Sequence, residues 1–181
     1  MCSIWHINET ESVAFLSERT ALLCGIEPAV AKQIRIAAAL HDVGKQKIPA
    51  AILNKPGKLT KDEFEVIKEH TKLGAEMLEG VQGGLGAMAR TVCLTHHEWW
   101  DGNGYWGYRT DDLPPYVPIV AISDVFTALI CERPYKQAWP PREAMDYIQK
   151  QAGTQFSPDL VGVFLSMIQG DENVAAFFTG R

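Results

Sequence analysis

Imidazole and carboxylate side chains occupy positions of this chain where the helical pattern calls for apolar residues. His41, His70, His96 and Asp124 each fall on the apolar stripe of a different predicted helix. A single histidine on such a stripe is more often a core residue than a ligand, but a buried carboxylate is costly unless it is paired or bound to a cation. Four such residues on four helices therefore predict a fold in which the helices converge on a metal centre.

Two of these positions belong to adjacent pairs, His41-Asp42 and His96-His97. Neighbouring residues on a helix point about 100° apart, so each pair can serve two metals that share a bridging group. The donors are nitrogen and oxygen atoms without a thiolate, which favours a hydrolytic centre over a structural zinc site. From the residues alone we expect a di-metal hydrolase.

Almost every segment of the 181 residues has the periodicity of an amphipathic helix, and no segment alternates convincingly as a strand. Gly44 ends one helix, Thr60 opens a capping box, and Ser157 begins one of two or three C-terminal helices. The loop 99–116 is long and rich in glycine, proline and aromatic residues, which is typical of functional loops. We expect an all-α fold, a single compact helical bundle of about seven to eight helices in one domain over residues 1–181. The expected helices cover residues 8–24, 28–43 and 60–79, a segment ending at 96–97, and residues 118–131, with 45–59 and 80–86 as connections.

Composition narrows the functional classes. A net charge of −5 argues against a protein that binds nucleic-acid polymers. The chain contains no uninterrupted apolar stretch of the roughly 18 residues that a membrane span needs, and residues 1–5 lack the basic start of a signal peptide. The four cysteines are scattered, which favours buried free thiols in a reducing compartment. We therefore expect a cytoplasmic protein without a membrane span.

Several motifs in a fixed order give the chain a specific resemblance. His-Asp-Val-Gly-Lys at 41–45 resembles the signature of the HD phosphohydrolase superfamily. Further segments resemble its HD-GYP subgroup, and the match extends from about Glu9 to Met167. This resemblance implies a helical HD-domain bundle and a phosphodiesterase that hydrolyses cyclic di-GMP to linear pGpG, and sometimes on to GMP. It also implies two or three divalent metal ions, most often iron or manganese. The further matching segments are 47–60, 96–105, 123–129 and 133–136.

The resemblance assigns roles to individual residues. Asp42 matches the carboxylate that bridges two metals, and Lys45 matches the lysine beside the attacked phosphate, which makes these two the catalytic candidates. Arg133 and Lys136 match groups that hold the substrate's phosphates, and Tyr105 lies in the loop that names the subgroup. The positions that match the metal ligands are His41, Asp42, His70, His96, His97 and Asp124.

The chain departs from the family pattern at three positions. Glu9 stands where the family has a metal-binding histidine in its first helix, and we expect it to be a substitute ligand. The alternative is a solvated glutamate in the first turn. Trp106 follows Gly104-Tyr105 where the family has proline, and we expect the loss of a fixed φ to loosen substrate or partner contacts. Trp99 replaces a common arginine and makes the loop more apolar.

The expected mechanism is in-line attack on phosphorus by a hydroxide that bridges two metals, with Lys45 stabilising the charge that develops. No nucleophilic side chain is needed. One alternative is a degenerate regulatory module that binds cyclic di-GMP or a partner protein through the loop 99–116. Another is an HD phosphohydrolase that acts on a different nucleotide. Retention of all six core ligands argues against lost catalysis.

Overall fold

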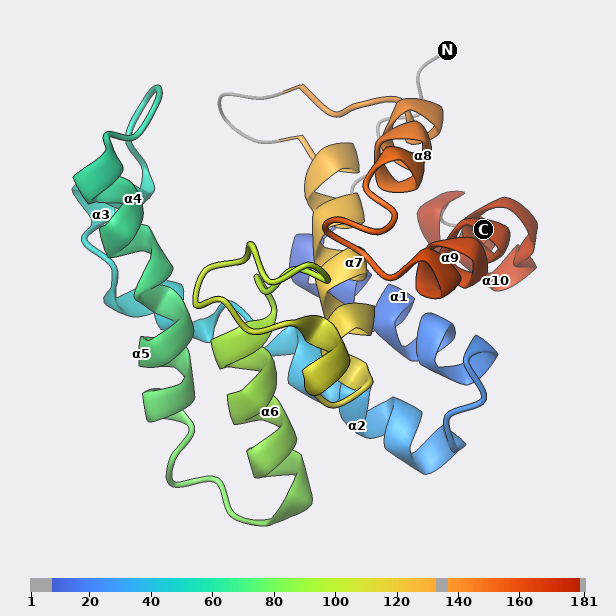
Figure 1. The fold of residues 1–181 in the computed structure, drawn as a ribbon, viewed down its shortest axis with the longest axis horizontal. Coiled ribbons are helices and arrows are strands. Elements are labelled where there is room, and N and C mark those ends of the chain that lie inside the picture. The colour runs from blue at the N-terminus through green and yellow to red at the C-terminus, as the bar shows by residue number, and fades with distance from the viewer. Residues whose placement is uncertain (1–7, 133–136, 180–181) are drawn as a thin grey trace.

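A computed structural model describes residues 8–132 and 137–179, and in these ranges every regular element is a helix (Figure 1). The all-α expectation is confirmed. The expected number of seven to eight helices agrees with the structure when α4 and α5 are counted as one interrupted helix and the four-residue helix α3 is not counted. The elements are α1 (Glu9–Leu23), α2 (Pro28–Ala39), η1 (Val43–Lys47), α3 (Ala50–Leu53), α4 (Lys61–Lys68), α5 (His70–Met77), α6 (Gly83–Thr95), η2 (Thr110–Asp112), α7 (Tyr116–Ile130), α8 (Pro141–Lys150), α9 (Pro158–Gly170) and α10 (Glu172–Thr179).

The helix α7 forms the centre of the bundle, with α1, α6, α8 and α9 packed around it (Figure 1). Most of its residues are buried, including Ile122 and Phe126, which belong to the main apolar core. Val13 and Leu16 of α1 and Ile34 of α2 join the same core. A helix that is apolar on nearly all sides is stable only when other elements surround it. This packing places Asp124, in the middle of α7, inside the protein.

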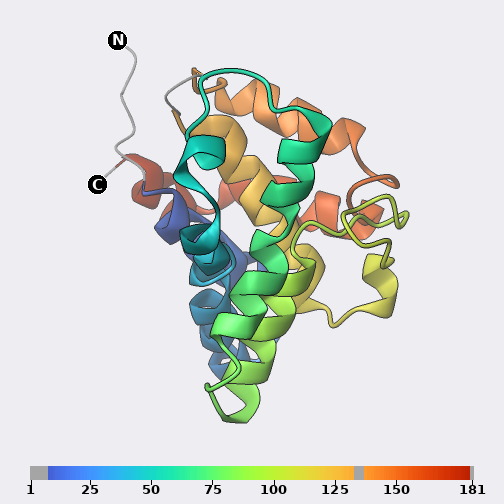
Figure 2. The ribbon, with the colours of Figure 1, turned by 90° about the vertical axis from the view of Figure 1, so that its left-hand side faces the viewer.

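The segment expected as one helix over 60–79 is divided at Glu69 into α4 and α5. The expected capping box is present, because the side chain of Thr60 accepts from the amide of Glu63 and the side chain of Glu63 accepts from the amide of Thr60. Figure 2 shows α5 beside α6 along the length of the molecule, with α4 above it. The break makes His70 the first residue of α5 and points its side chain inward.

The helix expected over 28–43 ends at Ala39, so His41 and Asp42 lie in a turn and not on a helix. The turn leads into η1, where Gly44 lies directly against α5. A Cβ atom at residue 44 would lie 2.0 Å from the carbonyl oxygen of His70, so this approach requires glycine. The expected connection 45–59 therefore contains short helical elements, the end of η1 and α3.

The remaining boundaries differ by a few residues from expectation. The helix α6 begins at Gly83, inside the expected connection 80–86, and the C-terminal segment supplies α8, α9 and α10. Ser157 precedes α9, as expected. Within the two described ranges, no helix combines the length and the hydropathy that crossing a membrane requires.

Candidate metal centre

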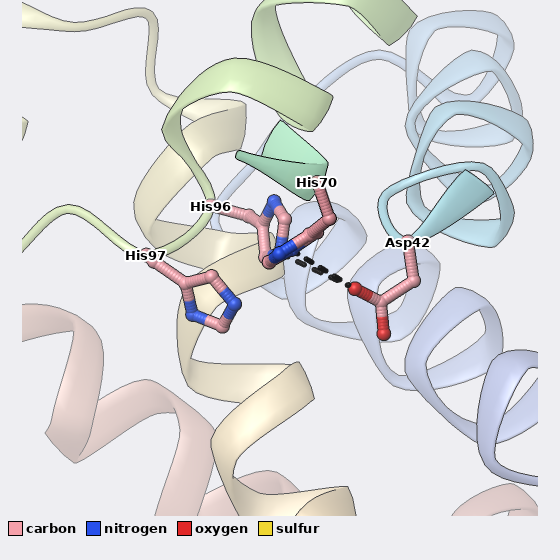
Figure 3. A group of neighbouring side chains, drawn as sticks. All are labelled: Asp42, His70, His96 and His97. Atoms are coloured by element: carbon pink, nitrogen blue, oxygen red, sulfur yellow. Dashed lines mark hydrogen bonds and ion pairs between the residues drawn. The ribbon is translucent and has the colours of Figure 1, made fainter. Parts of the chain in front are cut away.

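Two groups of metal-ligand side chains meet where η1, α5, α6 and α7 come together. In each group the donor atoms all lie within 4.8 Å of one another. Figure 3 shows the larger group, in which the adjacent pair His96-His97 points toward Asp42 and His70 from other segments of the chain. The smaller group shares one histidine with it, so the two form one continuous site. The larger group is Asp42, His70, His96 and His97, and the smaller is His41, His96 and Asp124.

The carboxylate of Asp42 belongs to the larger group and also lies close to His41 of the smaller group. Its Oδ1 is 3.2 Å from Nε2 of His70 and 3.8 Å from Nε2 of His96. Its Oδ2 is 3.2 Å from Nε2 of His41, and that nitrogen is 3.5 Å from Oδ1 of Asp124. Each oxygen of Asp42 therefore points to a different set of histidines, which is the arrangement a carboxylate needs to bridge two cations.

Backbone carbonyl groups fix the tautomers of three histidines. The Nδ1 atoms of His41, His70 and His96 lie 2.7, 2.6 and 3.0 Å from carbonyl oxygens of their preceding turns. A carbonyl oxygen can only accept, so each Nδ1 must carry the proton. In the neutral ring the Nε2 lone pair then points into the centre, as in metal-ligating histidines whose other nitrogen donates to a carbonyl group.

Two buried atoms of the centre have no hydrogen-bond partner among the described residues: Nε2 of His41 and Oδ1 of Asp42. Buried polar atoms in folded proteins are almost always satisfied, so each exception requires an explanation. A divalent cation would satisfy both atoms, and imidazole with carboxylate is a donor set that suits iron, manganese and zinc. The residues present therefore fit a metal centre.

The electrostatics of the ligand cluster also favour a cation. Burial lowers the pKa of His41, but the nearby carboxylates of Asp124 and Asp42 outweigh burial and raise it to about 10. Burial lowers the pKa of His97 to about 4 and that of His96 well below its usual value. Burial raises the pKa of Asp42 and of Asp124. Their histidine partners outweigh burial and hold both pKa values below the usual range. The proton on His41 thus supplies part of the positive charge that cations would bring.

A cavity of about 300 Å³ opens above the centre and is lined in part by His70, His97 and Asp124. Lys45 of η1 lines the same cavity, and its Nζ contacts Oδ2 of Asp42. Tyr105 lines it too, with its ring 4.4 Å from the ring of His97 between centroids. The cavity therefore brings a cation, an aromatic ring and the ligand cluster to one space.

Glu98 organises the loop that carries Tyr105. The residue is 1% exposed, and its two carboxylate oxygens accept from the backbone amides of Trp106 and Tyr108 at 2.8 and 2.9 Å. Burial raises the pKa of Glu98, although these amide donors oppose the shift. A Cβ atom at Gly104 would lie 2.5 Å from Cα of Glu98, so the loop approaches closely only with glycine there. The buried carboxylate thus folds the loop back onto the end of α6.

Trp106 adds contacts that a proline cannot make. Its backbone amide donates to Glu98, and proline has no such N–H. Its indole N–H donates to Oγ1 of Thr71 at 3.1 Å, and Nζ of Lys72 lies 3.7 Å from the centroid of its ring. Trp106 thus attaches the loop to α5. The expectation of looser substrate or partner contacts stays a prediction.

The structure brings together all six core ligands expected from the sequence, with Lys45 and Tyr105 beside them. Glu9 is the first residue of α1, is half-buried, and belongs to neither group of candidate ligands. Its role as a ligand stays a prediction. Arg133 and Lys136 lie outside the described residues.

Sequence reasoning assigned no role to two residues near the centre. Glu98 is the third residue of His-His-Glu and is followed by a glycine-rich loop. Its charge at that position was the sequence signal that could have indicated a role. Tyr147 of α8 lines the cavity, but nothing in its local sequence indicates this.

Comparisons with known proteins agree with this geometry. The family model described as HD domain matches residues 3–160. A cyclic di-GMP phosphodiesterase of Thermotoga maritima is 41% identical over 159 residues, which cover 87% of this chain and 43% of that protein. A 3′3′-cGAMP-specific phosphodiesterase 2 of Vibrio cholerae is 40% identical over 156 residues, which cover 86% of this chain and 30% of that protein. The chain belongs to the HD domain family and spans less than half the length of these relatives.

The fold also resembles solved structures. Bd1817, described as an HDG"Y"P protein from Bdellovibrio bacteriovorus, superposes with a TM-score of 0.71 at 19% identity, covering 93% of this chain and 53% of that one. At this identity the likeness concerns the fold alone. It supports the helical bundle.

Proposed function

We propose that this chain is the catalytic domain of a metal-dependent phosphodiesterase that hydrolyses cyclic di-GMP to linear pGpG. The observation that carries the proposal is the position of Asp42, whose two oxygens point to different sets of histidines next to a cavity lined in part by Lys45 and His70. Similarity to proteins named cyclic di-GMP phosphodiesterases supports the substrate class. Further hydrolysis to GMP stays an expectation.

Two divalent cations, iron or manganese, would be held by the two ligand groups, with Asp42 between them. When bound, such cations neutralise charge on phosphate oxygens and lower the pKa of a water molecule at the site. The histidines contribute fixed geometry, because hydrogen bonds from Nδ1 to backbone carbonyls hold their rings. Glu9, which stands where the family has a metal-binding histidine, is the residue that we propose as a further ligand of one metal.

Lys45 is placed to act on the phosphate. Its ammonium group lines the cavity and contacts Oδ2 of Asp42. The same ammonium group would act on a phosphate oxygen or on the departing sugar oxygen of a substrate in this cavity. A positive charge in a partly buried site stabilises developing negative charge more than it would in water.

A related substrate is the second candidate. A relative of nearly the same identity is named for 3′3′-cGAMP, which contains one adenine in place of a guanine. The degenerate regulatory module is less well supported. A module that only binds would gain nothing from the unsatisfied buried atoms of His41 and Asp42. A protein partner at the loop 99–116 and a cytoplasmic location remain predictions.

The deciding experiment measures metal content and turnover on the same anaerobically purified protein. We expect about two equivalents of iron or manganese and conversion of cyclic di-GMP to pGpG. Asp42→Ala should lose most metal and all turnover with little change in helix content, because it removes the carboxylate that contacts histidines of both ligand groups. Glu76→Ala, which changes an exposed carboxylate on α5, is the matched control. Full metal content without turnover in the wild-type protein would favour the regulatory module, and unchanged metal content in Asp42→Ala would refute the assigned centre.

A further inference from the structure

The cavity above the metal centre has two chemically different parts. Its base is polar and consists of candidate metal ligands and Lys45. Its walls are apolar and aromatic, and they come from α4, the loop 99–116, α7 and α8. A mononucleotide has the same division, with a charged phosphate and a flat, largely apolar base face. The wall residues are Ile67, Tyr105, Val125, Ala128, Leu129 and Tyr147.

Tyr147 is held in place by contacts with Trp139 and Gln155. Its ring lies edge-on to the ring of Trp139, with 6.0 Å between centroids and 86° between planes. Its hydroxyl group donates to Oε1 of Gln155 at 3.3 Å. The amide of Trp139 in turn donates to the carbonyl oxygen of Leu129, another wall residue. The hydroxyl group of Tyr147 is thus engaged with the protein, and the ring is the part that remains for a ligand.

Tyr105 is held just as firmly. Its ring packs on His97, with 34° between planes, and edge-on against Phe64 of α4 at 5.8 Å between centroids. The amide of the next residue is bound to the buried Glu98. Two fixed aromatic rings from segments far apart in the chain therefore line one cavity.

We propose that this wall receives the nucleobase next to the attacked phosphate, and that it holds the base by stacking and apolar contact rather than by reading its edge. This inference rests on the proposed function and names the specificity of the same site. Among the described lining residues, the polar groups are the metal ligands, Lys45 and two tyrosine hydroxyl groups. Stacking tolerates every base, because each has a π-face. A site rejects a base strongly only when buried polar groups would be left unpaired.

The size of the cavity limits what it can hold. A volume of about 300 Å³ is at the lower end of small-molecule pockets. It suits one nucleotide unit and not a whole cyclic dinucleotide. The second base would then lie outside the cavity, so this wall governs recognition of one base only. Guanine and adenine should both be accepted there.

The test uses the metal-loaded protein with cyclic di-GMP, 3′3′-cGAMP, cyclic di-AMP and bis(4-nitrophenyl) phosphate. We expect kcat/KM for 3′3′-cGAMP to lie within about tenfold of the better of the two symmetric dinucleotides, because either of its bases can occupy a wall that is tolerant of sequence. Tyr147→Ala should raise KM for all three by roughly 5- to 150-fold with normal metal content, as expected for loss of one stacking contact. Tyr147→Phe should keep the wild-type KM. Tyr108→Ala, at an exposed tyrosine of the same loop as Tyr105, is the matched control.

Each result is decisive. A kcat/KM for 3′3′-cGAMP more than about tenfold below that of the better symmetric dinucleotide, or a KM in Tyr147→Ala less than about 5-fold above wild type, overturns the stacking wall. If the loaded protein hydrolyses bis(4-nitrophenyl) phosphate while these results fail, only this inference falls and the phosphodiesterase proposal stands. If no phosphodiester is hydrolysed, the proposed function falls. Equilibrium binding of GMP and AMP then tests the stacking wall. The wall is supported if both nucleotides bind the wild-type protein and bind Tyr147→Ala more weakly, and it is refuted otherwise.

Discussion

Replacing Gly44 by alanine should move Asp42 away from His70 in the metal centre. A Cβ atom there would lie 2.0 Å from the carbonyl oxygen of His70 and 2.4 Å from the amide nitrogen of Gly74. Both are backbone atoms of α5, so neither can rotate away, and ordinary contacts begin at 3.4 Å. The segment η1 must therefore move off α5. Asp42 directly precedes η1 and lies 3.2 Å from His70, so this displacement would pull the shared carboxylate from its histidine partner.

The magnitude follows from the kind of contact. Overpacking a well-packed site costs about 1–3 kcal/mol. For a domain of this size, about 1 kcal/mol lowers Tm by about 2–4 °C, so Gly44→Ala should lower Tm by about 2–12 °C in the metal-free protein. Gly162→Ala is the control, because Gly162 lies within α9 and no neighbouring side chain or segment of the described residues comes within 4 Å of the position that its Cβ atom would take. Alanine is the better helix former by about 1 kcal/mol, so that variant should be unchanged or more stable.

The assay combines calorimetry in chelator with metal analysis after loading. Metal-free Tm reports the packing of η1 on α5, and metal content reports the integrity of the ligand set. We expect Gly44→Ala to lower both the Tm and the metal content, and Gly162→Ala to lower neither. A Gly44→Ala protein with wild-type Tm and wild-type metal content would refute the close packing described for η1.

Four further outcomes are expected. Lys45→Ala should mainly lower kcat with normal metal content, because its charge acts as the leaving oxygen departs; a pure rise in KM would contradict this role. Trp106→Pro should expose its loop to hydrogen exchange and cost about 1–3 kcal/mol, because one oxygen of the buried Glu98 loses its amide donor, whereas Trp106→Phe keeps that donor and should show less exchange. Glu9→Gln should weaken one metal and leave the others bound; full occupancy with wild-type activity would make it a surface residue. The raised pKa of His41, about 10, means that it binds a proton at neutral pH that must leave on ligation, so metal affinity should rise with pH up to that value, and calorimetric heats should depend on the buffer.

The types of ligand and the helical fold follow from the sequence by itself. A period of 3.6 residues makes a histidine or aspartate on an apolar stripe visible in the sequence, as at His70, His96 and Asp124. The cost of burying such groups then predicts that they meet. Local rules also predicted the capping box at Thr60 and the start of α9 after Ser157.

Only the tertiary structure decided how these groups share space. The packing of η1 against α5 is not encoded by any local pattern. On it depend the division of the helix at Glu69 and the turn that contains His41 and Asp42. The same holds for Glu98, whose partners are amides of a loop, and for Tyr147, which reaches the cavity because α8 packs on α7. Periodicity reports which face of an element is buried, but the partner across the interface is set by how distant segments pack together.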